Sequence, residues 1–302
     1  MRRYRRHKRH LGAKFLSFLL VVAMGAALFN YVRPLPKAEA SVTALSSQIG
    51  SIQLTWPASG SAALGAQGFG LLATHGSQQP RPTASMAKII TALIVLEKHP
   101  LSPGQQGPVI TLTASDLALF NKYYGEGGSY VKVAVGEQIT EYQMLQAMLL
   151  PSANNIADSI AVWSFGSLGD YATYANTTWL KRQGLNNTHV GGDASGFLPD
   201  TTSTTADFIH LGELALNNPI IAEIVQQKSA TIPVHGVIYS TNARLGFNNI
   251  IGIKTGLTDQ AGGCFLFASR YTVPGSSKPI VIIGVIMGTQ TLLEALNASE
   301  PL

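Results

Sequence analysis

Two residues of the stretch TASMAK (83–88) have the types and the spacing that nucleophilic catalysis needs. Ser85 and Lys88 are three positions apart, so on a helix their side chains lie on one face within reach of each other. A serine hydroxyl is a poor nucleophile until a neighbouring base removes its proton. The alternative is that Ser85 only begins the helix, because serine is a favoured cap. The pair alone leaves both interpretations open, since Ser-x-x-Lys also occurs by chance.

Two further motifs, PSAN and GIKTG, follow in the chain and bear on that choice. They supply five residues: Ser152, Asn154, Lys254, Thr255 and Gly256. Ser-x-x-Lys, Ser-x-Asn and Lys-Thr-Gly in this order are the signature of penicillin-binding proteins and class A β-lactamases. Three ordered motifs arise by accident far less often than one. Taken singly, Ser152 and Asn154 also suit the start of a helix after a proline, and Lys254 an ordinary strand end.

Lys88 can act as a base only in its neutral form, whereas a free lysine is protonated at neutral pH. Burial disfavours the ammonium form, and so does a second cation nearby. Lys254 is the obvious second cation, which predicts that folding brings the two lysines together. Ser85 also lies near the start of its helix, where free N–H groups and the helix dipole favour a developing negative charge.

The composition excludes several other classes of function. The 302 residues are 46% hydrophobic and 12% charged, which is typical of a folded chain with a large core. The net charge of +5 comes from residues 1–40, which hold nine Lys or Arg and one Glu, so the remainder is mildly acidic. No basic face is left to bind nucleic acid.

Metal, thiol and histidine chemistry have little support in the sequence. The seven histidines form no pair spaced like metal ligands, so we expect neither a metal nor another cofactor. The single cysteine, Cys264, excludes an intramolecular disulfide and is best interpreted as a small buried residue. The nearest candidate for a histidine-based triad, DASGF (193–197), lacks the Gly-x-Ser-x-Gly elbow.

The first forty residues have the features of an export leader. MRRYRRHKRH is a positively charged start, residues 15–32 form an apolar run of eighteen, and AEA (38–40) resembles a cleavage site. A cleaved signal peptide and an uncleaved membrane anchor both fit this pattern. Either one places a polar linker (41–50) and a single catalytic domain (51–302) outside the cytoplasmic membrane, in the periplasm or the cell wall.

Strands at both ends of this domain, with helices between them, predict an α/β (α+β) fold. Both ends of the chain form an antiparallel sheet that is flanked by helices, and a helical lobe (about 100–230) is inserted. Ser85 and Lys88 begin a helix (84–99) that is apolar on nearly every face, which indicates a buried central helix. The other predicted helices are 140–151, 153–165, 170–184, 205–217 and 291–302, and the strands are 51–57, 62–67, 68–75, 236–241, 250–256, 264–273 and 279–288.

Longer stretches around the motifs resemble the D-alanyl-D-alanine carboxypeptidases, the low-molecular-mass penicillin-binding proteins of serine peptidase family S11. The resemblance covers roughly residues 50–290 and implies the serine β-lactamase/penicillin-binding-protein-like fold. Many members carry a β-rich domain and an amphipathic membrane helix after the catalytic domain. This chain ends too early for either, so we expect no C-terminal β domain. The stretches that carry the resemblance are 82–98, 125–161, 193–216 and 250–269.

The resemblance implies a catalytic role for Ser85, Lys88 and Ser152, and a substrate-binding role for Asn154 and Leu257. Ser85 carries the acyl group and Lys88 is its base. The oxyanion hole consists of the backbone N–H groups of Ser85 and Leu257, and a main-chain role tolerates the leucine side chain. Ser152 passes a proton between Lys88 and the leaving amine. Asn154 holds the amide of the substrate and orients Lys88.

It implies a substrate-binding role for the third motif. Lys254 and the Thr255 hydroxyl bind the terminal carboxylate through charge-assisted hydrogen bonds, which restricts cleavage to the last residue of a peptide. Gly256 leaves the strand edge open for the peptide to lie alongside. Arg244, just ahead of this strand, is a further candidate for the carboxylate pocket, with a surface role as the alternative.

These roles describe an exported serine-type D-Ala-D-Ala carboxypeptidase that removes the terminal D-alanine of peptidoglycan stem peptides. The implied partners are the stem peptide, β-lactam inhibitors that acylate Ser85, and the membrane if the leader is uncleaved; nucleic acid is not among them. A serine β-lactamase, a DD-endopeptidase or transpeptidase of the same fold, and a wall-binding scaffold without turnover are the alternatives. A class A β-lactamase needs a glutamate in a Glu-x-x-Leu-Asn setting, and neither Glu213 nor Glu223 has it.

Overall fold

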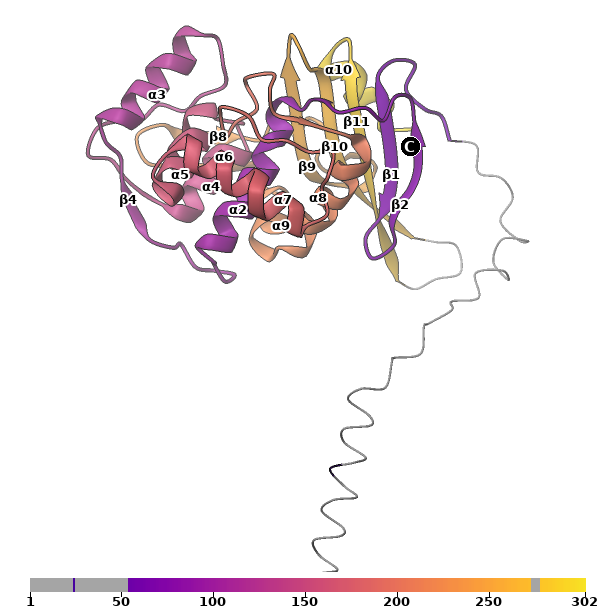
Figure 1. Ribbon diagram of the computed structural model, residues 1–302, viewed down its shortest axis with the longest axis horizontal. Coiled ribbons are helices and arrows are strands. Elements are labelled where there is room, and N and C mark those ends of the chain that lie inside the picture. Colours follow the sequence, from indigo (N-terminus) through magenta and orange to yellow (C-terminus); the bar gives the residue numbers. More distant parts are fainter. Residues whose placement is uncertain (1–23, 25–53, 273–277) are drawn as a thin grey trace, which may run out of the picture. The chain divides into compact units, whose positions relative to one another are not determined.

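The computed structural model of the protein describes Met24, residues 54–272 and residues 278–302 (Figure 1). Leu54–Leu302 form one compact unit. The predicted leader and linker (1–50) lie outside the described residues, apart from Met24. None of the helices that the structure describes is long and apolar enough to cross a bilayer.

A five-stranded antiparallel sheet forms the framework of the unit, with its strands in the order β2-β1-β11-β10-β9 (Figure 1). β1 and β11 are neighbours although they come from opposite ends of the chain, and Ser61 pairs with Met287. The prediction of a sheet formed by both chain ends is therefore confirmed. The strands are β1 Ser61–Ala66, β2 Gly70–His75, β9 Ile250–Thr258, β10 Gly262–Thr272 and β11 Pro279–Thr289.

The predicted first strand, 51–57, is wrong in its described part. Residues 54–57 form no strand. Pro57 has no N–H for a strand ladder, and Leu54 and Trp56 pack instead against a buried hydrophobic cluster of the sheet. The Trp56 ring also stacks on His75 of β2, with 5.4 Å between the ring centroids. The apolar residues of this segment thus cover the sheet and do not extend it.

The two faces of the sheet bury separate hydrophobic clusters, because successive strand residues point to opposite sides. On β10, Leu266 belongs to the larger cluster, whereas Phe265 and Phe267 belong to the smaller one. The helix α8 (Thr205–Asn217) covers the first face, and α10 (Leu292–Ala298), the predicted C-terminal helix, covers the second. Cys264 is fully buried, as predicted.

The helical lobe lies between β2 and β9 in the chain. Its other helices are α2 Ala87–Lys98, α3 Ala114–Gly125, α4 Glu141–Leu149, α5 Asn154–Phe165, α6 Leu168–Tyr174, α7 Leu180–Arg182 and α9 Pro219–Ile224. α3 and α9 were not predicted, and a π turn divides the predicted helix 170–184 into α6 and α7. Short antiparallel pairs complete the lobe: β3 Arg81–Pro82 with β6 Thr202–Ser203, β4 Val109–Thr111 with β5 Gln138–Thr140, and β7 Ser229–Ile232 with β8 Gly236–Tyr239.

α2 is the buried central helix that the sequence predicts. Its first ten residues are all buried, Lys88 included. The helix packs against α4 and α5 of the lobe and against α8, which covers the sheet (Figure 1). The short 3-10 helix Ala84–Met86 precedes it and contacts β9 and β10. Ser85 therefore lies where the lobe meets the edge strand of the sheet.

Candidate active site

Ser85 does not cap the central helix. It lies inside the 3-10 helix Ala84–Met86, whose N-cap is Thr83, and the N-cap of α2 is Met86. Its side chain makes no capping hydrogen bond, and its Oγ lies 2.8 Å from Lys88 Nζ. Ala84 has a φ of +45°, a left-handed conformation that is rare for alanine and typical of backbone held at a functional site. The geometry thus favours a chemical role for Ser85 over a capping role.

Lys88 is completely buried, and its amine has three polar neighbours. Nζ donates hydrogen bonds to the Ser85 Oγ at 2.8 Å, to Asn154 Oδ1 at 2.7 Å and to the Ser195 carbonyl oxygen at 2.9 Å. Burial lowers the pKa of Lys88 to about 7, although two carboxylates, Asp193 and Asp158, oppose the shift. Close to neutral pH the amine is therefore available in both its charged and its neutral form.

Lys254 and Ser152 lie in the same constellation. Lys254 is 1% exposed, and its Nζ donates to Ser152 Oγ at 3.0 Å and to the Thr255 carbonyl oxygen at 3.0 Å. Burial, and then the neighbouring Lys88, lower the pKa of Lys254. The two lysines are close enough to interact, as predicted, because Lys88 lowers the pKa of Lys254; burial has the larger effect on Lys254 and is what lowers the pKa of Lys88. Ser152 has a φ of +67° and thus, like Ala84, holds a left-handed conformation.

Neither Ser152 nor Asn154 acts as a side-chain cap of α5, which was the alternative for both. The N-cap of α5 is Ala153, and no side-chain hydrogen bond caps the helix. Ser152 precedes the helix and contacts Lys254, whereas Asn154 begins it and contacts Lys88. The backbone N–H of Asn154 donates to the Ser129 carbonyl, which fixes the start of α5 against the 126–131 loop.

β9, the edge strand of the sheet, brings the third motif close to Ser85. The hydroxyls of Thr255 and Thr241 are 2.7 Å apart, so Thr241 adds a second hydroxyl beside the motif that the sequence did not single out. An added Cβ on Gly256 would lie 3.1 Å from the Ser85 backbone nitrogen and 3.0 Å from the Ala84 Cβ. The close approach of β9 to the backbone of Ala84 and Ser85 therefore favours glycine at this position.

Leu257 follows the motif on β9, and its side chain is 54% exposed. The outer edge of β9 pairs with no other strand among residues 54–272 and 278–302, which leaves room for an extended peptide. Arg244 is not in this pocket: its guanidinium forms a salt bridge with Glu300 and a hydrogen bond with Asn297 of α10. The surface interpretation of Arg244 is thus the correct one.

A loop at residues 193–198 contributes to the site and was missed in the sequence analysis. DASGF was considered there only as a poor nucleophile elbow, yet the Ser195 carbonyl contacts Lys88 directly. A backbone carbonyl carries no signature in residue type. The buried Asp158 and Asp193, which hold this loop, were missed for a related reason, because their hydrogen bonds reach Lys88 only through it. No group of three or more His, Cys, Asp or Glu that could bind a metal occurs among the described residues.

Comparison with known proteins identifies the family. The family model of the D-alanyl-D-alanine carboxypeptidases matches residues 59–291, well over half of the chain. The chain belongs to this family. Its members are serine-type hydrolases that act on peptidoglycan, so the family resemblance and the enzyme class predicted from the sequence are both confirmed.

Individual relatives are distant. The D-alanyl-D-alanine carboxypeptidase of Streptomyces sp. (strain K15) is 27% identical over 219 residues, which cover 66% of this chain and 71% of that protein. Across the curated relatives that match, the chain spans 53% to 71% of their own lengths. The relatives include both carboxypeptidases and D-alanyl-D-alanine endopeptidases.

Solved structures of the family share the fold. The crystal structure of the Streptomyces K15 DD-transpeptidase matches with a TM-score of 0.70 at 21% identity, covering 83% of this chain and 97% of that one. Penicillin-binding protein D2 of Listeria monocytogenes, in its ampicillin-bound form, matches with a TM-score of 0.65 at 23% identity, covering 84% and 98%. The predicted β-lactamase/penicillin-binding-protein-like fold is therefore confirmed.

Proposed function

We propose that this protein is a serine D-Ala-D-Ala carboxypeptidase in which Ser85 is the nucleophile and Lys88 its base. The observation that carries the proposal is the position of the Lys88 amine, fully buried and 2.8 Å from the Ser85 hydroxyl. Burial lowers the pKa of Lys88 to about 7, so a large share of the amine is neutral at physiological pH. A structural lysine needs neither a buried position nor a serine partner.

Acylation in this site forms a bond between Ser85 Oγ and the carbonyl carbon, breaks the peptide C–N bond, and moves one proton from Ser85 to the departing amine. The Ser85 hydroxyl gives its proton to Lys88 Nζ while Oγ attacks the carbonyl carbon of the scissile peptide bond. The backbone N–H groups of Ser85 and Leu257 stabilise the resulting oxyanion. When the C–N bond breaks, Ser152 gives its hydroxyl proton to the departing amine and regains the proton that Lys88 took from Ser85. Because the Ser152 Oγ accepts from Lys254 Nζ at 3.0 Å in the structure, this transfer requires Ser152 to turn toward Lys88. Water then hydrolyses the acyl-enzyme and regenerates the Ser85 hydroxyl.

The substrate is the C-terminal D-Ala-D-Ala of a peptidoglycan stem peptide. Lys254, Thr255 and Thr241 place an amine and two hydroxyls at the end of the constellation, where a terminal carboxylate would accept hydrogen bonds from them. A carboxylate also offsets the desolvation that lowers the pKa of Lys254, so binding the substrate and charging this lysine favour each other. Asn154 holds the amide of the penultimate residue, and the peptide extends along the open edge of β9.

β-Lactams should acylate the same serine, and the acyl-enzyme should be long-lived. A β-lactamase of class A would need a glutamate to activate the deacylating water. Glu213 and Glu223 are both engaged elsewhere: Glu213 accepts from the Gly68 N–H and Glu223 from the Tyr142 hydroxyl. The structure offers this alternative no support.

The site of action follows from the substrate. Peptidoglycan lies outside the cytoplasmic membrane, so the domain must be exported. The charged and apolar leader of residues 1–40 supports export, and retention of this leader would attach the domain to the membrane.

Two measurements on residues 41–302 test this function. A fluorescent penicillin should label the wild type and leave a Ser85→Ala variant unlabelled, with slow release of the label. Mass spectrometry of a pentapeptide stem should then show the loss of one terminal alanine. Absence of labelling would leave the scaffold alternative, and rapid release of hydrolysed drug would indicate a β-lactamase. Cleavage or joining of cross-linked dimers in place of alanine loss would indicate an endopeptidase or a transpeptidase.

A further inference from the structure

The loop at residues 193–198, whose Ser195 carbonyl accepts a hydrogen bond from Lys88, is held by a buried carboxylate. Asp193 accepts three backbone hydrogen bonds, from the N–H of Gly196 at 3.1 Å, of Phe197 at 2.9 Å and of Leu198 at 3.3 Å. The Ser195 hydroxyl donates to the same carboxylate at 2.6 Å. Because Asp193 is only 2% exposed, these bonds form away from solvent and fix residues 193–198 as one turn.

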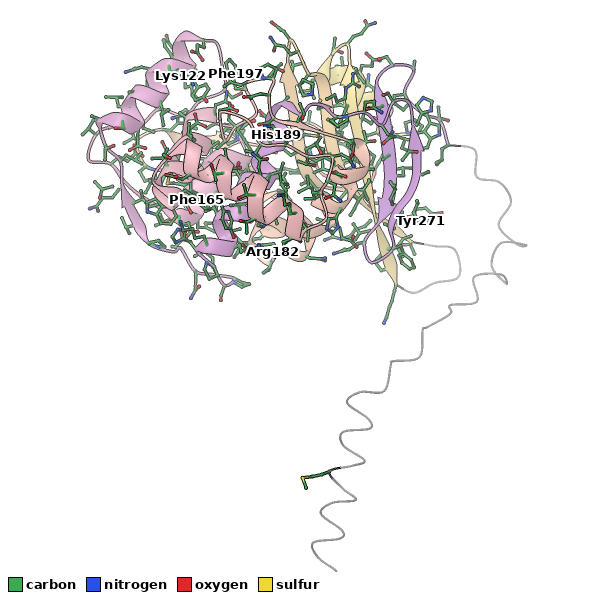
Figure 2. All side chains as sticks on the ribbon, viewed as in Figure 1. Lys122, Phe165, Arg182, His189, Phe197 and Tyr271 are labelled. Carbon is green, nitrogen blue, oxygen red and sulfur yellow. The ribbon has the colours of Figure 1, made fainter. Side chains whose placement is uncertain are left out.

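A second buried carboxylate fixes the same loop from the lobe. Asp158 of α5 accepts the Ala194 N–H at 2.9 Å and the Tyr123 hydroxyl at 2.6 Å. Tyr123 of α3 is fully buried, and its ring meets that of Phe197 edge to face at 5.5 Å. Lys122 Nζ lies over the Tyr123 ring, 4.7 Å from its centroid; Lys122 and Phe197 are labelled in Figure 2. Two helices thus hold the Ser195 carbonyl in place.

The Ser195 carbonyl helps to decide which way the lone pair of the Lys88 amine points, because a neutral amine has only two N–H groups to donate. A neutral lysine amine has two N–H donors and one lone pair. Of the three neighbours of Lys88 Nζ, the Asn154 Oδ1 and the Ser195 carbonyl oxygen can only accept, whereas the Ser85 hydroxyl can also donate. The two acceptors take up both N–H groups, so the lone pair is left to the Ser85 proton.

The same carboxylates set the charge around the amine. Four charged groups bear on Lys88: Lys254 from β9, Asp193 from the loop and Asp158 from α5 directly, and Lys122 of α3 through Asp158. Asp193 and Asp158 stabilise the ammonium form and so oppose the effect of burial on the pKa of Lys88. Burial raises the pKa of Asp158 itself to about 6, so this carboxylate is ionised over the range in which Lys88 loses its proton.

We propose that Asp193, Asp158 and Tyr123 are positioning residues of the acylation step, which hold the Ser195 carbonyl so that the lone pair of Lys88 faces Ser85. The inference rests on the proposed function, because it assumes that Lys88 is the base. It goes further in assigning a part in the reaction to three residues outside the motifs. None of them touches the substrate, and each acts through Lys88.

The decisive variant is Asp158→Asn, which removes a charge and keeps the shape. The new amide oxygen can still accept the Ala194 N–H, and its NH2 can donate to the Tyr123 hydroxyl. We expect the acylation rate at high pH to stay within about threefold of the wild type. The acid limb of the pH profile should move to lower pH by about half a unit or more, because the ammonium form loses an anionic neighbour.

Asp193→Asn tests the geometry together with the charge, so the acid limb should again move to lower pH. An amide has one acceptor oxygen where the carboxylate has two, so at least one loop N–H loses its partner. The high-pH acylation rate should fall tenfold or more while the apparent affinity for the penicillin changes little. If this variant does not fold, Ser195→Ala, which removes one bond to Asp193, should give a smaller loss in the same direction. Tyr123→Phe should fall between them.

The measurement is the second-order rate of labelling by a fluorescent penicillin from pH 5.5 to 9, on folded protein quantified by thermal denaturation. Asp116→Asn is the matched control, since it removes a carboxylate from the capping box of α3 without altering the network. If Asp193, Asp158 and Tyr123 had a purely structural role, the labelling rate of each variant would fall only in proportion to its folded fraction. The acid limb of the pH profile would then stay where it is in the wild type.

An unshifted limb in Asp158→Asn, or a wild-type rate in both folded Asp193→Asn and Ser195→Ala, would overturn the inference. Failure of the wild type to label at Ser85 would instead overturn the proposed function.

Discussion

At the scale of single residues, the proposed mechanism depends on a lysine that gains and loses one proton while it keeps the same hydrogen-bond partners. As an ammonium ion, Lys88 donates to all three of its partners; as an amine, it donates to two and accepts from Ser85. Only the direction of one hydrogen bond changes. The buried site is therefore satisfied in both states, which keeps the cost of proton transfer low.

The pH profile of acylation should report this proton directly. In the proposed mechanism the neutral amine is the active form, and burial lowers the pKa of Lys88 to about 7. The rate should therefore rise as the pH increases through about 7 and fall roughly tenfold for each unit below it. Labelling rates measured between pH 5.5 and 8.5 give the midpoint. A rate that is flat across this range would show that Lys88 is not the base.

Lys88→Arg should abolish the base while keeping a cation. Arginine stays protonated, so the acylation rate should fall by a factor of about 10² to 10⁴. Lys98→Arg, at the other end of the same helix, is the matched control and should label like the wild type. Comparable losses in both variants would indicate a general effect on α2. The readout is the labelling rate at pH 8, with intact-mass analysis to locate the adduct.

At the scale of elements, the helix and strands that carry the three motifs could be predicted from the sequence. The loop that supports the motif residues could not. The central helix, the flanking strands and the three motifs follow from apolar periodicity and from residue types that the chemistry requires. The loop at 193–198 was not predicted, because it acts through the Ser195 carbonyl, and any residue has a carbonyl. The strand predicted at 51–57 was wrong because a short apolar run that covers a sheet looks the same as one that joins it.

The contact between β9 and the 3-10 helix of Ser85 predicts the effect of Gly256→Ala. The new methyl group would lie 3.1 Å from the Ser85 nitrogen, closer than the packing allows, so one of the two elements must shift. Since this nitrogen belongs to the proposed oxyanion hole, we expect a loss of acylation of about tenfold to a hundredfold. The free energy of unfolding should fall by about 1–3 kcal/mol.

Gly125→Ala is the control for that variant, because the added methyl meets nothing within 4 Å there. Labelling rates and denaturant titrations on both variants separate the two effects. An acylation rate within twofold of the wild type in Gly256→Ala would show that β9 tolerates a side chain at the site.

At the scale of the whole molecule, one carboxyl group remote from the motif residues should couple folding to pH. Glu141, at the start of α4, is fully buried, and both of its carboxyl oxygens lack a hydrogen-bond partner. Burial raises the pKa of Glu141 from 4.5 to about 7. The folded state therefore favours the protonated form of Glu141. The contribution of this group to the stability of the folded state is fully present below pH 4.5 and is lost as the pH rises through 7.

Glu141→Gln removes the ionisation and should flatten that dependence. We compare the free energy of unfolding of the variant with that of the wild type at each pH. This difference should favour the variant by about 1–3 kcal/mol more at pH 8.5 than at pH 5. Denaturant unfolding at both pH values measures the change, and Glu126→Gln, at an exposed position, should leave it as in the wild type. A difference that is the same at pH 5 and pH 8.5 would show that Glu141 is not protonated in the folded state.

The pairing of β1 with β11 has a consequence for the order of events during synthesis. The ribosome releases Ser61 some two hundred residues before its strand partner Met287. Until then the first hairpin has no neighbour on its inner side, and a long-range closure of this kind is slow. The five-stranded sheet of a nascent chain therefore stays incomplete until β11 has been synthesised.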